Sequence, residues 1–202
     1  MSVSTSEPNG KNVLQLKITL RDTRPPVWRR IQVRDDITMA KLHDVLQIVM
    51  GWDDAHLHEF ELGRLFIRTP VPGCPEWIDD AKDARKIKLR DLRCEEKTRF
   101  GYTYDMGDNW EHIVLVEKIL PVDKTAPQAI CLKGKLACPP EDCGGVWGYD
   151  EIVEMLQNPQ QPDFAERLQW LNRQYEDGYT PAYFSVEEVN QELQQLLSSK
   201  AS

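Results

Sequence analysis

Alternating apolar and polar residues predict two strands at the start of the chain. Between Leu14 and Leu20 every second residue is apolar, and glutamine, lysine and threonine occupy the positions between them. The same alternation returns over residues 27–33, after the turn-like sequence DTRPP at 22–26. A period of two residues is typical of a strand with one buried face. We therefore expect these two strands to pair as a hairpin.

A helix is predicted next, because the spacing of apolar residues changes to three and four. Thr38 is a suitable N-cap, and Gly51 is a suitable end. The helix would bury a stripe made of Leu42, Val45, Leu46, Val49 and Met50. Residues 56–67 alternate again, which predicts a strand that turns at Gly63 into another. Prolines and clustered acids over residues 69–83 predict an irregular connection.

A second hairpin is predicted over residues 100–117. Phe100, Tyr102 and Tyr104 share one face of its first strand, and the turn-forming sequence DMGDNW at 105–110 precedes the second. A short helix is expected around Leu89. The last third of the chain predicts three helices, over residues 149–157, 162–175 and 186–197, and the last begins with Ser185 and Glu188 in capping-box spacing.

Strands dominate the first two thirds of the chain and helices the last third. This segregation predicts an α+β fold in which helices cover one face of an antiparallel sheet. Residues 1–12 are polar and without pattern, so we expect a disordered tail. Residues 13–202 are expected to form a single α+β domain, with residues 161–202 as a C-terminal helical extension.

Composition narrows the classes of function. No window approaches 18 consecutive apolar residues and no secretion signal is visible, so a cytoplasmic protein without membrane contact is expected. Five irregularly spaced cysteines predict reduced thiols. The net charge of -8 argues against general nucleic-acid binding, which requires lysine and arginine to displace counterions from phosphates.

Two dense motifs stand out from the rest of the chain: YTYDMGDNWEHIVLVEKI at 102–119 and CPPEDCGGVWGYDEIVEML at 138–156. We call them the first and second signature segments. Both place acidic and aromatic residues on turns beside patterned elements, where functional residues tend to gather. A surface for a small-molecule or protein partner is therefore predicted from Asp105, Asp108, Trp110, His112, Glu141, Asp142, Trp147 and Tyr149. The alternative interpretation places the aromatic residues in the core.

A divalent metal is the cofactor that these residues suggest, and no other cofactor is predicted. If the hairpins over residues 56–67 and 100–117 were neighbours, they could together bind zinc, manganese or iron. The ligands would be His56, His58, His112, Asp105 and Asp108. The alternative is that the two aspartates satisfy turn amides and that His112 lies at the edge of a buried strand face. Cys138 and Cys143 flank two prolines, and a structural turn is favoured there over a zinc site.

Four stretches of the chain resemble the plasmid pRiA4b ORF-3-like family, whose members are sometimes labelled TnpR-like passenger proteins of mobile elements. They are LKITLRDTRPPVWRRIQV, VMGWDDAHLHEFEL, YTYDMGDNWEHIVLVEK and CPPEDCGGVWGYDEIVEML, which together span about residues 13–160. The resemblance implies an α+β domain and no established activity. A serine resolvase is excluded, because no serine occurs between Glu7 and Phe184, and the same absence argues against a serine hydrolase triad.

These observations support three hypotheses. The leading one is a protein that binds a ligand or partner through the 105–112 turn and the 138–149 loop. The second is a metal-dependent phosphoester hydrolase in which Asp105, Asp108, His112 and His58 hold an ion that activates water. The third is an accessory protein of a mobile DNA element without resolvase activity.

Overall fold

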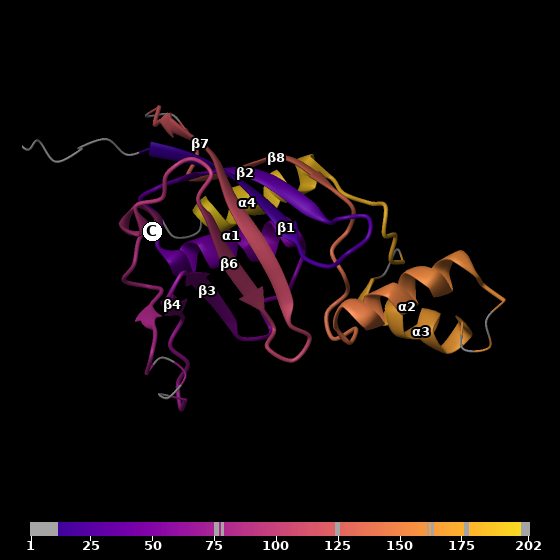
Figure 1. The fold of residues 1–202 in the computed structure, drawn as a ribbon. Helices are drawn as coiled ribbons and strands as arrows, with labels where there is room; N and C mark the ends of the chain where they lie inside the picture. Colours follow the sequence, from indigo (N-terminus) through magenta and orange to yellow (C-terminus); the bar gives the residue numbers. More distant parts are fainter. Residues whose placement is uncertain are drawn as a thin grey trace, which may run out of the picture.

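An eight-stranded sheet forms the centre of the protein, and the helices follow mainly in the last third of the chain. The computed structural model describes residues 12–74, 77, 79–123, 126–160, 162, 164–175 and 178–198. The strand order is β5-β4-β3-β6-β7-β1-β2-β8, and all neighbours are antiparallel except β4 and β5 (Figure 1). The predicted α+β fold is thus confirmed. The strands are β1 (Asn12–Leu20), β2 (Trp28–Arg34), β3 (His58–Leu62), β4 (Leu65–Arg68), β5 (Lys82–Asp83), β6 (Arg99–Tyr104), β7 (Trp110–Pro121) and β8 (Ala129–Lys135).

The three predicted hairpins form, and β1, β2 and β6 bury the apolar faces that the sequence predicts. Strands β1 and β2 pair with Leu16 opposite Ile31, both fully buried. Strands β3 and β4 turn at Gly63, whose φ of +62° is a conformation that glycine adopts without strain. Strands β6 and β7 pair with Tyr102 opposite His112. The predicted tail falls on residues 1–11, which lie outside the described residues, and on Asn12, which already belongs to β1.

Helix α1 (Met39–Met50) begins and ends where the sequence predicts. The Thr38 hydroxyl accepts a hydrogen bond from the Lys41 N–H, and Gly51 closes the helix with a φ of +93°. The apolar stripe of α1 packs against the sheet on the side that α4 (Val186–Ser198) also covers (Figure 1). The Ser185 hydroxyl accepts from the Glu188 N–H at 3.2 Å, which is one half of the predicted capping box.

Helix α4 also protects the outer edge of the sheet. The side-chain amide of Asn190 accepts from the Cys131 N–H at 2.8 Å and donates to the Cys131 carbonyl at 2.9 Å. Strand β8 is an edge strand, and exposed edges invite pairing with other chains. Asn190 therefore replaces the missing neighbour at the middle of β8.

Helices α2 (Gly145–Gln157) and α3 (Phe164–Gln174) pack against each other beside one end of the sheet (Figure 1). Helix α2 starts four residues before the predicted Tyr149, so the prediction of a loop up to residue 149 is wrong there. Gly144 and Gly145 have a positive φ, whereas Gly148 does not and lies inside the helix. The short helix predicted near Leu89 is a 3₁₀ helix (Leu89–Leu92) that buries Leu89.

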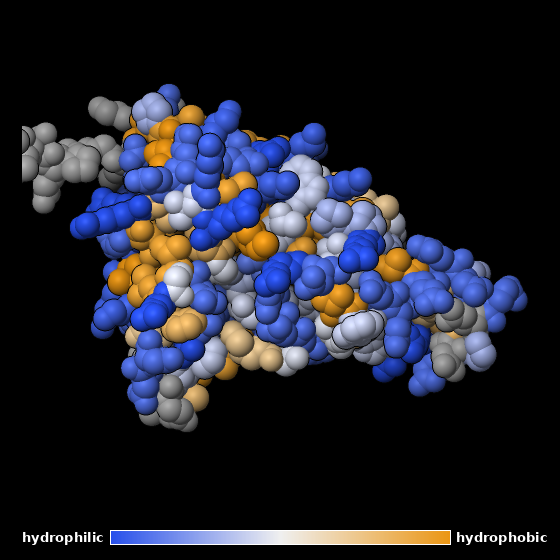
Figure 2. All heavy atoms as spheres, viewed as in Figure 1, coloured by the Kyte–Doolittle hydropathy of each residue, from blue (hydrophilic) through white to orange (hydrophobic). Residues whose placement is uncertain are grey.

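The face of the sheet that the helices leave open is mostly polar. Arg30 forms a bidentate ion pair with Glu117, which also accepts from Gln15. Figure 2 shows hydrophilic residues with scattered hydrophobic ones over the visible side of the molecule. Among the described residues, no helix combines the length and the apolar composition needed to cross a membrane.

Candidate functional site

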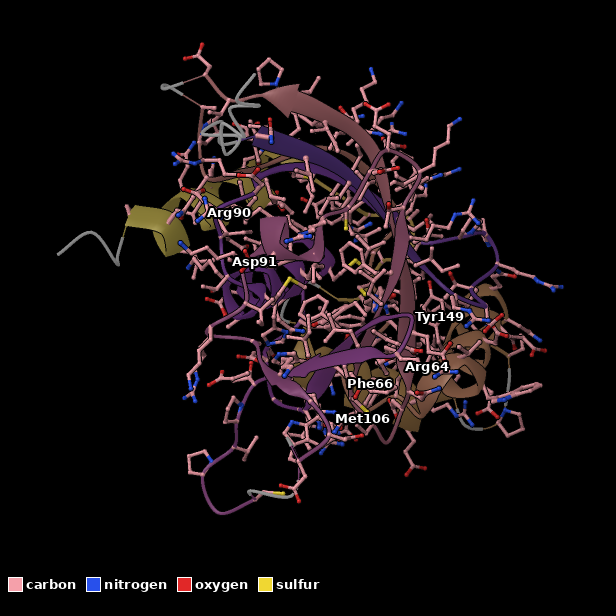
Figure 3. All side chains as sticks on the ribbon, turned by 60° about the vertical axis from the view of Figure 1, so that its left-hand side comes forward. Arg64, Phe66, Arg90, Asp91, Met106 and Tyr149 are labelled. Atoms are coloured by element: carbon pink, nitrogen blue, oxygen red, sulfur yellow. The ribbon has the colours of Figure 1, made fainter. Side chains whose placement is uncertain are left out.

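The two signature segments contact each other. Tyr104, the last residue of β6, donates its hydroxyl proton to Glu141 Oε1 at 2.9 Å. The Gly144 N–H donates to Asp108 Oδ2 at 3.0 Å. A Cβ atom on Gly145 would lie 2.7 Å from the Asp108 carbonyl oxygen, so the close approach of the segments requires glycine. Figure 3 labels one residue of each segment, Met106 and Tyr149.

The turn between β6 and β7 fixes the position of Asp105. The Asn109 N–H donates to the Asp105 carbonyl at 2.7 Å, and both residues have a φ of +55°. Aspartate and asparagine tolerate this left-handed conformation better than most residues. The Gly107 N–H donates to Asp105 Oδ1 at 2.8 Å, as expected for an aspartate that satisfies a turn amide. Its second oxygen, Oδ2, lies 3.8 Å from His56 Nε2.

A third segment, just after α1, meets the same place. The Trp52 indole N–H donates to the Pro139 carbonyl at 3.1 Å, and the Asp53 N–H donates to Glu141 Oε1 at 3.0 Å. These bonds attach the 138–141 loop to the end of α1. Because His56 follows three residues after Asp53, the same segment brings an imidazole to the meeting point.

Four side chains converge here, and we call them the junction site: His56, Asp105, Glu141 and Asp142. His56 Nε2 lies 3.1 Å from Asp142 Oδ1 and 3.8 Å from both Asp105 Oδ2 and Glu141 Oε2. His56 Nε2 and Glu141 Oε2 are both inaccessible to solvent and have no hydrogen-bond partner among the described residues. Burial raises the pKa of Glu141, the main effect on that carboxyl group. The Asp142 side chain is 68% exposed, so the site opens to solvent on its side.

The spacing of these atoms suits a metal ion. Tetrahedral ligands with bonds of about 2.1 Å lie about 3.4 Å apart, and the distances from His56 Nε2 are 3.1 Å and 3.8 Å. The surrounding groups also orient the ligands. Asp105 Oδ1 accepts a hydrogen bond from the Gly107 N–H, and Glu141 Oε1 accepts from the Tyr104 hydroxyl and the Asp53 N–H. In each carboxylate the other oxygen is the one nearer to His56. Metal sites commonly use such supporting hydrogen bonds.

His58 belongs to a different cluster, with His43 and Asp54. The His43 and His58 rings stack with centroids 3.3 Å apart. His43 contacts Asp54 Oδ1 at 2.7 Å and the Tyr102 hydroxyl at 2.8 Å, so both of its ring nitrogens have partners. His58 Nε2 lies 3.1 Å from the Thr69 hydroxyl, and burial lowers the pKa of His58 to about 3. This cluster is largely satisfied by internal hydrogen bonds, which makes it the weaker candidate for a metal.

His112 is buried inside the sheet. Its side chain is on the same face as Val114 and Val116, its Nδ1 lies 3.0 Å from the Tyr102 carbonyl, and its ring meets Trp52 edge to face. Burial lowers the pKa of His112 to about 4. The predicted metal ligands are therefore not gathered at one point: His56 and Asp105 lie in the junction site, whereas His58, His112 and Asp108 lie elsewhere.

The predicted ligand or partner surface is divided in the same way. Trp110, His112 and Tyr149 are in the core, with 0%, 2% and 4% of their surface exposed, so their side chains are not available to a partner. Trp147 is 84% exposed at the start of α2. Asp105, Glu141 and Asp142 belong to the junction site, and Asp108 holds the Gly144 N–H.

Comparison with known proteins places the chain in a family. The family described as "Plasmid pRiA4b ORF-3-like protein" matches residues 12–188. This chain belongs to that family. The match continues past residue 160, where the sequence resemblance was expected to end, and includes α3.

Two relatives extend the comparison. "Uncharacterized protein y4hQ" of Sinorhizobium fredii is 39% identical over 161 residues, which are 79% of this chain and 80% of that protein. A crystal structure described as a protein of unknown function, MM3350 from Methanosarcina mazei Go1, superposes with a TM-score of 0.76 at 36% identity. The superposition covers 89% of this chain and 98% of the other. The fold is thus shared with that protein.

Four possible metal ligands were not recognised from the sequence. Glu141 and Asp142 were predicted as surface residues rather than as metal ligands, and neither His43 nor Asp54 was selected. The only available signal was the charged loop EDC at 141–143 beside two prolines. No spacing rule connects that loop to His56, which lies about 85 residues earlier in the chain.

Proposed function

We propose that this protein binds a divalent cation at the junction site, where the 105–112 turn and the 138–149 loop meet His56. One observation carries the proposal: His56 Nε2 and Glu141 Oε2 are buried without hydrogen-bond partners and face the carboxylates of Asp105 and Asp142. Buried polar atoms normally have hydrogen-bond partners, so two buried atoms that make no hydrogen bond and face the same point suggest a ligand between them.

Charge supports the same conclusion. Three carboxyl groups lie within 3.8 Å of one imidazole nitrogen, and the ligand oxygens of Asp105 and Asp142 lie within 4.8 Å of each other, so these carboxylates repel each other. Burial already disfavours the charged form of Glu141. A cation in the centre would offset both effects, because its charge favours all three carboxylates in the ionised form.

The ligand types favour particular ions. One imidazole nitrogen and three carboxylate oxygens match zinc, manganese or iron, whereas calcium and magnesium prefer oxygen ligands alone. The hydrogen bonds from Gly107, Tyr104 and Asp53 would hold two of the carboxylates in the orientation that the ion needs.

Thermal unfolding of protein purified without an affinity tag tests the proposal. After treatment with a chelator, zinc or manganese at about 100 times its dissociation constant should stabilise the fold by about 2.7 kcal/mol. For a chain of this size, that gain corresponds to roughly 5–10 °C. The His56→Gln variant should lose the gain. Elemental analysis of the untreated protein should find one of these metals, and a wild-type chain that no divalent ion stabilises would contradict the proposal.

Exposure at Asp142 supports a second candidate, a metal-dependent hydrolase of phosphoesters. Its side chain is 68% exposed, so manganese or iron with more than four ligands would also bind water on this side, and a metal-bound water is a nucleophile near neutral pH. The residues would be those of the junction site rather than Asp108, His112 and His58. Hydrolysis of bis(p-nitrophenyl) phosphate that requires both manganese and His56 would support the enzyme. An accessory role in mobile DNA stays a prediction of the resemblance alone.

The exposed Trp147 supports the partner-binding part of the prediction. Tryptophan is enriched among the residues that dominate protein interfaces. Trp147 lines a hollow of about 610 Å³ together with Arg21, Asn109 and Gly145, so both signature segments contribute to it.

A further inference from the structure

A second cavity lies away from the carboxylates of the junction site, beside the C-terminal end of α1. Its volume is about 840 Å³, within the range of sites that bind small molecules. Its wall combines apolar and aromatic side chains with one buried cation and two acids. Its lining includes Arg29, Tyr175, Tyr179, Thr180, Phe184, Glu188 and Glu192.

Arg29 is a buried cation on the wall of this cavity. The residue is 1% exposed. Its Nε donates to the Val49 carbonyl at 2.5 Å, and its Nη1 donates to the carbonyls of Trp28 at 2.9 Å and Lys135 at 3.1 Å. These bonds fix the guanidinium between α1, β2 and β8. Nη2 makes no hydrogen bond to any described residue, so its two N–H groups are left for another acceptor.

No carboxylate forms an ion pair with Arg29 within the described part of the chain, although Glu188 and Glu192 line the same cavity. The titratable groups that interact with it are Cys131, Cys138, Tyr179 and His112. Burial raises the pKa of the first three and lowers that of His112, so all four are neutral near pH 7. The three carbonyls carry only partial charges. Because arginine stays protonated in proteins, the cation is buried without a counter-ion, and such charges are normally paired.

The rest of the wall indicates what kind of molecule would provide the missing charge. The Phe184 ring covers one face of the guanidinium with its centroid 3.9 Å from Cζ, and Gly134 leaves the space that both side chains need. The Tyr175 and Tyr179 rings lie 5.1 Å apart, tilted by 54° to each other, and add aromatic surface. Glu188 and Glu192 also line the cavity and would repel a ligand with a second negative charge.

We propose that this cavity binds a small molecule with one carboxylate and an aromatic or aliphatic body. The carboxylate pairs with the free N–H groups of Arg29, and the body lies against Phe184 and the tyrosines. Arginine is suited to this role because its planar fork matches a carboxylate. The proposal does not depend on a metal at the junction site.

Ligand titrations followed by NMR test the proposal with benzoate and hexanoate as probes. Benzyl alcohol has the shape of benzoate without its charge, and phenyl phosphate carries a second charge. Benzoate or hexanoate should bind at least about tenfold more tightly than benzyl alcohol, because a site that expects a charged acceptor rejects the analogue without it. Phenyl phosphate should bind more weakly than benzoate. Equal binding of benzoate and benzyl alcohol, or no binding of either carboxylate at millimolar concentration, would overturn the proposal.

Two variants avoid the structural contacts of Arg29. Glu192→Gln removes an acid from the wall and should strengthen benzoate binding about threefold, since one unfavourable charge interaction is lost. Glu187→Gln, an exposed acid on the same helix that does not line the cavity, is the matched control and should change nothing. Thr180→Trp at an exposed wall position should obstruct the cavity and abolish binding without lowering the melting temperature. Equal effects of the two glutamate variants would contradict the proposed location.

Discussion

Tyr104 donates its hydroxyl proton to Glu141 Oε1 at 2.9 Å, and the same hydroxyl oxygen accepts from the Ala55 N–H at 3.0 Å. One phenol thus connects the end of β6, the 138–144 loop and the segment that carries His56. This bond leaves Glu141 Oε2 unpartnered within the junction site. The contact explains how segments that are far apart in the sequence hold a common set of ligands.

The Tyr104→Phe variant should show how much the orientation of the Glu141 carboxylate contributes to metal affinity, with all the metal ligands kept. It removes no metal ligand, but it frees the Glu141 carboxylate to rotate. Loss of a supporting hydrogen bond of this kind weakens metal binding by roughly 10–100-fold. The unfolding free energy should also fall by about 1–2 kcal/mol, because the Ala55 N–H loses its acceptor. Metal titration and urea unfolding measure the two effects.

Tyr102→Phe is the matched control for that variant. Tyr102 lies on the same face of the same strand, and its hydroxyl contacts Gln47 and His43 rather than a junction residue. The control should lose stability to a similar extent and keep its metal affinity. If both variants weakened metal binding equally, the hydrogen bond to Glu141 would not have the role assigned to it.

Stability should decrease as the pH falls below about 6.5. Burial lowers the pKa of His112 to about 4 and that of His58 to about 3, from an ordinary value of 6.5. Between these values the unfolded chain binds protons that the folded chain does not. The stabilisation is therefore complete above pH 6.5 and is lost as the pH falls toward 4. Each histidine should contribute a slope on the order of 1.4 kcal/mol per pH unit.

Urea unfolding of the chelated protein between pH 7 and pH 4.5 measures this slope. In the His112→Phe variant the slope should be smaller by about 1.4 kcal/mol per pH unit, which corresponds to one proton. The imidazole that resists protonation in the folded protein is absent from this variant. A slope that is the same in the variant and the wild type would show that His112 does not take up a proton on unfolding.

Gly145→Ala should disturb the contact between the signature segments. Gly145 has a φ of +68°, and a Cβ there would lie 2.7 Å from the Asp108 carbonyl oxygen. The left-handed conformation costs about 1–2 kcal/mol for a non-glycine residue, and the overlap adds about 1–3 kcal/mol. Gly63→Ala is the control: its φ is +62°, but nothing lies within 4 Å of its Cβ position. The Gly63→Ala variant should lose only the about 1–2 kcal/mol that the left-handed conformation costs, and it should keep its metal affinity. Calorimetric unfolding and metal titration measure the two quantities.

Local patterns were sufficient to predict most of the fold. The alternation between Leu14 and Leu20 and the three-and-four spacing after Thr38 both reflect one buried face, so they predict β1 and α1 with their caps. The start of α2 was misplaced because glycine is a weak helix former, and Gly148 nevertheless lies within the helix. A Cβ on Gly148 would lie 1.7 Å from the Cys143 carbonyl oxygen, a packing constraint that no local pattern reveals.

The site could be predicted only in part. His56 and Asp105 were selected because imidazole and carboxylate groups are metal ligands, but which of them meet depends on the order β3-β6-β7 and on a loop that arrives from residues 138–144. His112 shows the limit of residue type as a guide. The alternation of β7 places it with Val114 in the buried face, as the alternative interpretation of the sequence required.

The most direct test is a calorimetric titration of tag-free, chelator-treated protein with zinc and with manganese. The wild type should bind one ion per chain. Asp142→Asn, which alters an exposed ligand, should weaken the binding at least about tenfold, and Asp150→Asn, an exposed aspartate on α2, should not. No stoichiometric binding in the wild type, or equal binding in both variants, would contradict a cation site at His56, Asp105, Glu141 and Asp142.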